Sequence, residues 1–379
     1  MIDSARLKQA FSRHFNGSAS LFSAPGRINL IGEHTDYNDG FVFPGAIDLG
    51  ISAMITPNGS KTVNLYAIDM DQSCSFDIES VTPPESVHFR YVFGVIREMI
   101  AAGIDVQGFD AVYGGDVPLG AGMSSSAALE CCFAYALNDL FAQGRLDRMT
   151  LARIGQATEH KHIGVMCGIM DQFASMHGKA GSLLRLDCRS GEFSYFPWHP
   201  DGYRLVAINS CVKHELIGSP YNDRRASCHR VATLAGAKTL RDCSRQTLEL
   251  LRPQLSDEDY RRALYVIGEE ERVLAVCDAL EKDDYEEVGR QMYLTHQGLK
   301  EDYEVSCDEI DFLVDQAREA GVSGSRIMGG GFGGCTINLV RNDIYDTFLN
   351  KVQQDYLSHF GIECKPIPVV ISDGARRLQ

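Results

Sequence analysis

A short polar stretch near the N-terminus, residues 23–40, holds the side chains best suited to chemistry. It places five ionisable groups within eighteen positions: Arg27, Glu33, His34, Asp36 and Asp39. Because buried charges are costly unless they are paired, a core segment rarely contains so many. The stretch therefore indicates one wall of a cleft that binds a polar ligand, and a solvated loop is the alternative interpretation.

A glycine-rich loop, residues 118–123, runs into three consecutive serines and then into a predicted helix. Glycine lets the backbone approach a ligand closely, and a helix N-terminus presents unpaired N–H groups at the positive end of its dipole. A serine hydroxyl at such a place can also bind Mg²⁺. Three serines exceed what one helix cap needs, which favours a phosphate site over a capped turn. The candidate phosphate-binding residues are Gly120, Ala121, Gly122, Met123, Ser124, Ser125 and Ser126.

This loop differs from the better-known phosphate-binding patterns. It contains no lysine and no Gly-x-x-x-x-Gly-Lys-Ser/Thr sequence, so it is not a Walker loop. The chain has no His-Arg-Asp or Asp-Phe-Gly pair of motifs, which excludes a protein kinase. The loop also lacks Gly-x-Gly-x-x-Gly, which argues against a dinucleotide site.

Two carboxylates further along the chain are candidates for proton transfer or metal binding. Asp171 lies among mostly apolar neighbours at a predicted helix start, where the helix dipole favours its ionised form. It is a candidate general base or orienting carboxylate, with a helix cap as the alternative. Glu159 is a candidate Mg²⁺ ligand, although its surroundings also fit a surface glutamate. His160 and His162 would point apart on a helix, which argues against a zinc site.

Two segments of the second half could complete such a site. Residues 329–334 contain five glycines, more than a tight turn normally needs, and so predict close backbone approach or unusual φ angles. Tyr221 precedes an Asp and two Arg residues that fit a solvated helix start. Its ring could cover a ligand.

These residues need elements to hold them, and the hydrophobic pattern predicts both kinds. Strands are predicted at residues 21–24, 41–55, 63–68, 73–78, 109–113, 181–186, 203–209, 335–340 and 365–371. Helices are predicted at residues 3–16, 87–102, 127–142, 148–162, 222–236, 257–281, 283–299, 307–320 and 343–359, with one more from residue 170. Pro25-Gly26 predicts a turn after the first strand. The shift from β-rich to helical composition predicts an α+β chain with domains at residues 1–200 and 201–379.

Length and composition exclude several classes of protein. The chain has 379 residues, 44% of them hydrophobic, and a net charge of −15, which predict about two soluble domains and argue against a nucleic-acid partner. It has no signal-peptide pattern and no stretch of about eighteen apolar residues. Twelve cysteines without a Cys-x-x-Cys pair are typical of buried thiols in a reducing compartment. We expect a cytoplasmic protein with no membrane partner, and we favour a monomer.

Taken together, these motifs resemble the galactokinase family, within the superfamily that also holds homoserine, mevalonate and phosphomevalonate kinases. Residues 26–38 resemble the galactokinase signature, which the other branches lack. The loops at residues 118–127 and 329–334 resemble superfamily motifs for ATP chemistry, and the resemblance covers essentially the whole chain. It implies an α+β fold in which a ribosomal-protein-S5-domain-2-like N-terminal domain faces a ferredoxin-like C-terminal domain with extra helices across a cleft.

The resemblance also implies a role for each residue in phosphoryl transfer from ATP to the 1-hydroxyl of galactose. Asp171 would take the hydroxyl proton, while Arg27 would hold Asp171 ionised and stabilise charge on the phosphoryl group. Residues 120–126 would bind the ATP phosphates, Ser126 and Glu159 would hold Mg²⁺, and the 329–334 loop would close the site. The implied sugar-binding residues are Glu33, His34, Thr35, Asp36, Asp171 and Tyr221. Two departures are that Met123 stands where leucine is commoner in the family and that Pro220 stands where an acidic residue is frequent.

Two rival functions follow from the same motifs. A kinase for a related sugar, such as N-acetylgalactosamine or galacturonate, would share all of them. A sensor that binds sugar and ATP but regulates transcription would resemble galactokinase-like proteins with a shortened serine loop. Because Ser124, Ser125 and Ser126 are all present, together with Arg27 and Asp171, the sequence favours an enzyme.

Overall fold

A six-stranded sheet carries the first half of the chain in the computed structural model, which describes residues 4–118, 120–212 and 220–378. The strand order is β13-β1-β3-β6-β4-β5, and only β4 and β6 pair in parallel. The strands are β1 (Ser20–Asn29), β3 (Pro44–Pro57), β4 (Thr62–Ala67), β5 (Gln72–Asp77), β6 (Phe109–Gly115) and β13 (Arg376–Arg377).

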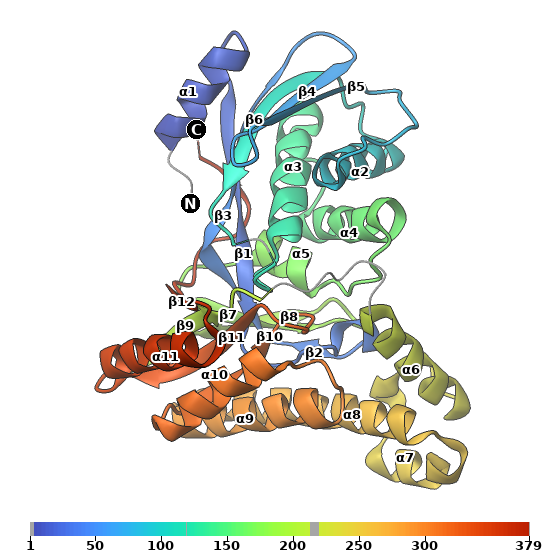
Figure 1. Ribbon diagram of the computed structural model, residues 1–379. Helices are drawn as coiled ribbons and strands as arrows, with labels where there is room; N and C mark the ends of the chain where they lie inside the picture. The colour runs from blue at the N-terminus through green and yellow to red at the C-terminus, as the bar shows by residue number, and fades with distance from the viewer. Residues whose placement is uncertain (1–3, 119, 213–219, 379) are drawn as a thin grey trace.

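Helices cover both faces of this sheet (Figure 1). Successive side chains of a strand point to opposite faces, and β1 illustrates the consequence. Phe22 packs in a core cluster with Phe133, while its neighbour Leu21 packs on the other side with Leu7 and Phe11. The helices of this half are α1 (Ser4–His14), α2 (Val87–Ala101), α3 (Ser125–Ala142), α4 (Arg148–Thr158) and α5 (Met170–His177).

The second half is built on a four-stranded antiparallel sheet with the order β10-β11-β9-β12. Val206 and Ile208 pack with one group of helices, α10 and α11, whereas Leu205 and Ala207 pack towards α8 and α9. The strands are β9 (Tyr203–Asn209), β10 (Gly324–Met328), β11 (Cys335–Arg341) and β12 (Lys365–Pro368). The helices are α6 (Pro220–Leu234), α7 (Arg245–Leu251), α8 (Asp257–Leu280), α9 (Tyr285–Glu301), α10 (Asp308–Glu319) and α11 (Tyr345–Phe360).

A small third sheet and one shared core join the two halves. The sheet consists of β2 (Phe41–Val42), β7 (Ser182–Asp187) and β8 (Phe193–Pro197). The shared cluster brings Ile31 and Phe43 of the first half together with Val273 and Met328 of the second. Burying apolar surface contributes about 25 cal/mol per Å², so this contact holds the halves together. The fold is α+β, which confirms the predicted fold class.

Most predicted elements are present, but one local prediction was wrong and one predicted helix changes type near its end. Pro25 and Gly26 do not end the first strand, because a β-bulge between Pro25 and Arg27 absorbs them and β1 continues to Asn29. The helix predicted at residues 148–162 ends at Thr158 and continues as a π-helical turn, η2 (Glu159–Ile163). Such turns are frequent at functional sites. Short elements α7, β8 and β13 were not predicted.

The last described residues return to the first sheet, although the predicted second domain runs to residue 379. Ile371 forms a bridge with Ile47, and β13 pairs with β1. Backbone hydrogen bonds join Gly374 N to the Gly178 carbonyl and Ala375 N to the Ser175 carbonyl, each at 2.8 Å. Composition alone does not show that the C-terminal residues pair with strands of the first sheet. The boundary near residue 200 stays a prediction.

Three single-turn helices complete the described elements: η1 (Asp36–Asn38), η3 (Leu240–Asp242) and η4 (Arg252–Gln254). Within the described residues, no helix combines the length and apolar character needed to cross a bilayer.

Candidate active site

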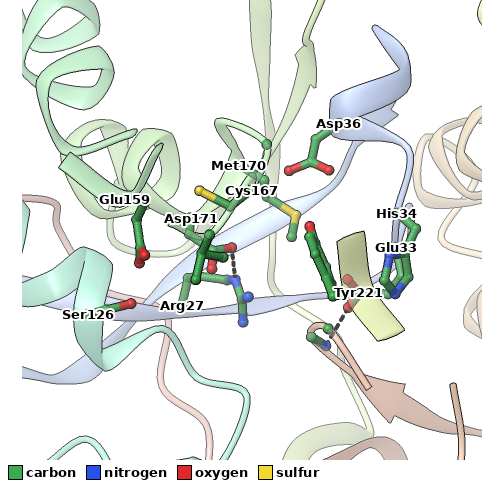
Figure 2. A pocket seen from close by; sticks show the side chains of 14 residues that line it. Arg27, Glu33, His34, Asp36, Ser126, Glu159, Cys167, Met170, Asp171 and Tyr221 are labelled. Carbon is green, nitrogen blue, oxygen red and sulfur yellow. Dashed lines mark hydrogen bonds and ion pairs between the residues drawn. The ribbon is translucent and has the colours of Figure 1, made fainter. Parts of the chain in front are cut away.

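A cavity of about 110 Å³ lies where the two halves meet. Figure 2 shows Ser126 and Glu159 at one end, Arg27 and Asp171 in the middle, and the signature residues with Tyr221 at the other. Eight of the residues predicted from the sequence line it: Arg27, Glu33, His34, Asp36, Ser126, Glu159, Asp171 and Tyr221. Gly329 and Gly330 of the late glycine loop line it as well.

Arg27 is fixed by the bulged strand β1 and by the serine loop. Its Nε donates to Asp171 Oδ1 at 2.7 Å, its Nη1 donates to the Gly122 carbonyl, and its backbone N–H donates to the Met123 carbonyl. Burial lowers the pKa of Arg27, but the charges of Asp171 and Glu33 outweigh it and raise the pKa above its usual value. The guanidinium therefore stays charged at the centre of the cavity.

Asp171 is the second residue of α5 and has a donor on each carboxylate oxygen. Arg27 occupies Oδ1, and the Ser124 hydroxyl donates to Oδ2 at 2.6 Å. Ser124 adopts a left-handed backbone conformation, with φ 60°, immediately before α3. The Ser124 side chain was predicted to serve the phosphate site, and its contact with Asp171 could not be anticipated from the sequence.

The predicted phosphate loop packs against the late glycine loop. Gly122 has φ +70°, and a Cβ there would lie 2.6 Å from the Met328 carbonyl oxygen, so only glycine fits. The side chains of Ala121 and Met123 are buried in the shared core. α3 begins at Ser125, so N–H groups of its first turn lack helical partners by geometry. Of the predicted loop residues, Ser126 lines the cavity directly.

Glu159 and Ser126 form a polar pair at that end of the cavity. Glu159 lies in the π-helical turn, where burial raises its pKa to about 7, and the Ser126 hydroxyl acts on the pKa in the opposite direction. Glu159 Oε2 is buried and has no hydrogen-bond partner within the described residues. A hydroxyl beside an unsatisfied carboxylate oxygen suits Mg²⁺, which usually takes one or two carboxylates and completes its shell with phosphate and water.

A second buried glutamate, Glu130, was missed by sequence reasoning. It lies on α3 and accepts a hydrogen bond from Gln172 Nε2 at 2.9 Å. Burial and the nearby Glu159 raise its pKa well above the usual range. The available signal was a single glutamate within the apolar run Ala127-Ala128-Leu129-Glu130-Cys131-Cys132.

At the other end, Asp36 points into the cavity beside Gly168. A Cβ on Gly168 would lie 1.8 Å from Asp36 Oδ2, so glycine leaves the space that this carboxylate occupies. Burial, followed by the charge of Asp171, raises the pKa of Asp36 to about 6, although the Tyr37 N–H donates to it at 3.0 Å.

His34 lies among tyrosine rings. Its Nδ1 is 2.7 Å from the Tyr37 hydroxyl, which in turn lies 2.7 Å from the Tyr303 hydroxyl. The Tyr221 ring centre is 5.4 Å from the imidazole. Burial and Arg224 lower the pKa of His34 to about 3, so the imidazole is neutral.

Glu33 faces the cavity, whereas Thr35 does not. Glu33 Oε1 accepts hydrogen bonds from Arg326 Nη1 at 3.1 Å and from the Gly329 N–H at 2.9 Å. The Thr35 hydroxyl lies 2.9 Å from the Gly32 carbonyl and 2.6 Å from the Phe41 carbonyl, and the residue is fully buried. Its bonds to the backbone shape the loop, and this geometry gives no support to the predicted contact of Thr35 with the sugar.

Family models match three segments of the chain. The galactokinase galactose-binding signature covers residues 9–57, the GHMP kinase N-terminal domain residues 90–179, and the GHMP kinase C-terminal domain residues 277–356. The chain is 38% identical to a galactokinase of Exiguobacterium sibiricum, over 98% of each protein. The chain belongs to the galactokinase family.

Two further comparisons agree with this family. A galactokinase of Glaesserella parasuis is 38% identical over 97% of each protein. The crystal structure of Lactococcus lactis galactokinase complexed with galactose superposes with a TM-score of 0.93 at 32% identity, and 99% of each chain is covered. The family's two-domain GHMP-kinase fold, predicted from the resemblance, is thereby confirmed.

Proposed function

We propose that this protein phosphorylates α-D-galactose at its 1-hydroxyl with ATP, forming galactose 1-phosphate and ADP. The observation that supports this most is Asp171, held between Arg27 and Ser124 in the cavity wall. It lies between a hydroxyl–carboxylate pair suited to a metal–phosphate group and a polar set suited to a sugar. Membership of the galactokinase family supports the same reaction.

In the proposed reaction, the sugar oxygen forms a bond to the γ-phosphorus while the bond to ADP breaks. Asp171 accepts the hydroxyl proton, because its carboxylate is fixed in direction by two donors. Arg27 supplies a permanent positive charge beside the transferring group. Phosphoryl transfer depends mainly on such positioning and charge stabilisation.

Ser126 and Glu159 are the residues that would hold Mg²⁺, since the unsatisfied Glu159 oxygen needs a cation or a donor. When bound, Mg²⁺ neutralises charge on the phosphate oxygens of ATP. The backbone N–H groups at the start of α3 would bind those phosphates. We therefore propose MgATP as the co-substrate.

The sugar hydroxyls would be bound by Asp36 and Glu33 as acceptors and by His34 and Tyr221 as neutral groups that donate or accept. Each sugar hydroxyl that is missing or inverted would leave a buried polar group unpaired, at a cost of about 1–3 kcal/mol. This is how the cavity would discriminate between epimers. A cytoplasmic location and a monomeric state remain predictions from the sequence.

A sugar panel tests the proposed substrate. Purified protein is assayed with MgATP and galactose, N-acetylgalactosamine, galacturonate, glucose and talose as acceptors. We expect the highest kcat/KM for galactose. A higher value for another sugar would contradict the proposal, and no turnover of any sugar would favour the sensor.

Asp171→Ala tests the proton acceptor in the same assay. We expect kcat to fall by a factor of about 10² or more, because general-base catalysis typically contributes 10²–10⁴. Galactose binding, measured by calorimetry, should remain detectable. Wild-type turnover by this variant would disprove the role of Asp171.

A further inference from the structure

Arg326 is a fully buried guanidinium that extends from β10 of the second half into the signature segment of the first. Its Nε donates to the Leu30 carbonyl at 2.9 Å, and its Nη2 donates to the Asn29 carbonyl. Its Nη1 donates to Glu33 Oε1 at 3.1 Å and to the Ile327 carbonyl at 2.7 Å. The exposed fractions of the Arg326 and Glu33 side chains are 0% and 2%. This is a buried ion pair between the two halves.

The main chain of Glu33 is also held by the second half. The Tyr265 hydroxyl donates to the Glu33 carbonyl at 3.0 Å. Glu269 Oε1 accepts hydrogen bonds from the Gly32 N–H at 2.8 Å and from the Glu33 N–H at 3.4 Å. Glu269 is itself fixed by Arg272 and Thr295 at its other oxygen. Three side chains from α8 and β10 thus define where Glu33 stands.

These contacts constrain what Glu33 can offer to a ligand. Oε1 is already shared by Arg326 and by the N–H of Gly329, which is itself part of the cavity wall. Oε2 takes part in neither bond and belongs to a residue that lines the cavity. A carboxylate in a charge-assisted pair accepts hydrogen bonds and donates none. A hydroxyl that donates suits this position, and an anionic group does not.

We propose that Arg326, together with Tyr265 and Glu269, is a positioning residue that sets sugar selectivity by fixing Glu33 as an acceptor for one sugar hydroxyl. The inference deepens the proposed function and rests on it. The selectivity of a binding segment in the first half is thereby controlled from the second half. Glu33 lies at the end of the cavity away from Ser126 and Glu159 (Figure 2), so we expect its position to affect the sugar more than MgATP.

Kinetics of Tyr265→Phe and of Arg326→Lys test this assignment. Loss of one hydrogen bond to Glu33 should raise KM for galactose roughly fivefold in Tyr265→Phe. In Arg326→Lys, where the guanidinium bonds to Glu33 and to the neighbouring backbone carbonyls are disrupted together, the increase should be roughly tenfold or more. KM for MgATP should stay within about twofold of wild type in both. Arg326→Met should be worse than Arg326→Lys, because it leaves Glu33 buried without its cation.

Monodeoxy galactoses identify the hydroxyl that Glu33 accepts. Among the 2-, 3-, 4- and 6-deoxy sugars, the one that lacks the hydroxyl accepted by Glu33 should show a large loss of kcat/KM with the wild type. That deoxy penalty should shrink in Tyr265→Phe and Arg326→Lys, since the acceptor is already misplaced, while the other deoxy penalties stay unchanged. Unchanged penalties at every position would overturn the proposal, as would equal rises in both KM values.

Tyr293→Phe is the matched control, because its hydroxyl also donates to a backbone carbonyl, that of Val322, at 2.9 Å. It should leave both KM values unchanged. If Arg326→Lys fails to fold, Tyr265→Phe still decides, because it removes a single oxygen atom. If the wild type has a higher kcat/KM for a sugar other than galactose, the proposed substrate fails. The positioning role is then tested with that sugar, by comparing the change in its KM with the change in KM for MgATP.

Discussion

Asp36 and Asp171 are aspartates of one cavity that have very different surroundings. Asp171 has Arg27 on one oxygen and Ser124 on the other. Asp36 accepts a backbone N–H, lies against Gly168 and feels the negative charge of Asp171. Burial and that charge raise its pKa to about 6. We therefore expect the protonation of Asp36 to set the pH dependence of sugar binding.

Galactose affinity should fall as the pH falls below about 6. If the sugar donates a hydroxyl to ionised Asp36, protonation removes the acceptor, and Kd should rise by roughly tenfold for each pH unit below the pKa. Calorimetric titration with galactose alone, from pH 4.5 to 8, measures this without involving the metal end of the cavity. Asp36→Asn should bind more weakly and lose the dependence near pH 6. A flat wild-type profile would contradict it.

The raised pKa of Asp36 makes folding stability change with pH in the direction opposite to galactose affinity. Folded Asp36 holds its proton up to about pH 6, whereas an unfolded aspartate loses it near pH 4. Between these values the folded state binds more protons, so the contribution of Asp36 to stability decreases as the pH rises through about 6. This loss of stability accompanies the presence of a buried carboxylate acceptor in the cavity.

At the scale of elements, the serine loop and the late glycine loop depend on each other for their shape. Gly122 approaches the Met328 carbonyl, and a Cβ on Gly329 would lie 3.1 Å from the Gly122 Cα. The Gly122 carbonyl also accepts a hydrogen bond from Arg27. Moving one loop therefore moves the acceptor of a proposed catalytic arginine.

Gly122→Ala should reduce kcat by roughly tenfold or more, because the new Cβ would meet the Met328 oxygen at 2.6 Å and displace the loop. Steady-state kinetics with galactose and MgATP measure this. Gly144→Ala is the matched control: it has a similar φ, +74°, but nothing lies within 4 Å of its new Cβ. It should lose a little stability and retain kcat. Equal kinetic defects in both variants would show that the loop contact does not matter.

At the scale of the whole molecule, the C-terminal tail closes the first sheet and supports α5, which carries Asp171. Ser372 N bonds to the Ala46 carbonyl, and Gly374 and Ala375 bond to residues at the end of α5. Ala375 is completely buried. The first sheet and α5 are therefore supported by residues that follow the whole second half in the sequence.

Deleting residues 372–379 should lower the free energy of unfolding by about 3 kcal/mol, since it removes several buried backbone hydrogen bonds. Denaturant unfolding followed by circular dichroism measures it, and kcat should fall as α5 loosens. Arg377→Ala keeps the backbone pairing and removes an exposed ion pair with Asp139, so it should change stability by less than about 1 kcal/mol. A deletion variant as stable as wild type would refute this role of the tail.

Much of the site could be predicted because its residues occur in short segments with unusual composition. The sequence predicted Arg27, Glu33, His34, Asp36, Ser126, Glu159, Asp171 and Tyr221, and all of them line one cavity. Arg326 and Glu130 were missed, since each lies in a segment that otherwise resembles an ordinary buried strand or helix. Thr35 was assigned to the sugar because it lies within the signature, although its hydroxyl turns to the backbone.

The sequence by itself determined which groups are present and which chemistry they suit, because composition and spacing are local properties. It predicted a phosphate loop, an acidic sugar-binding segment and a carboxylate base, and it placed most strands and helices. Only the tertiary structure decided that Ser124 faces Asp171, that Arg326 holds Glu33 and that the tail pairs with β1. These contacts join residues up to 355 positions apart, such as Phe22 and Arg377, and local pattern carries no information about them.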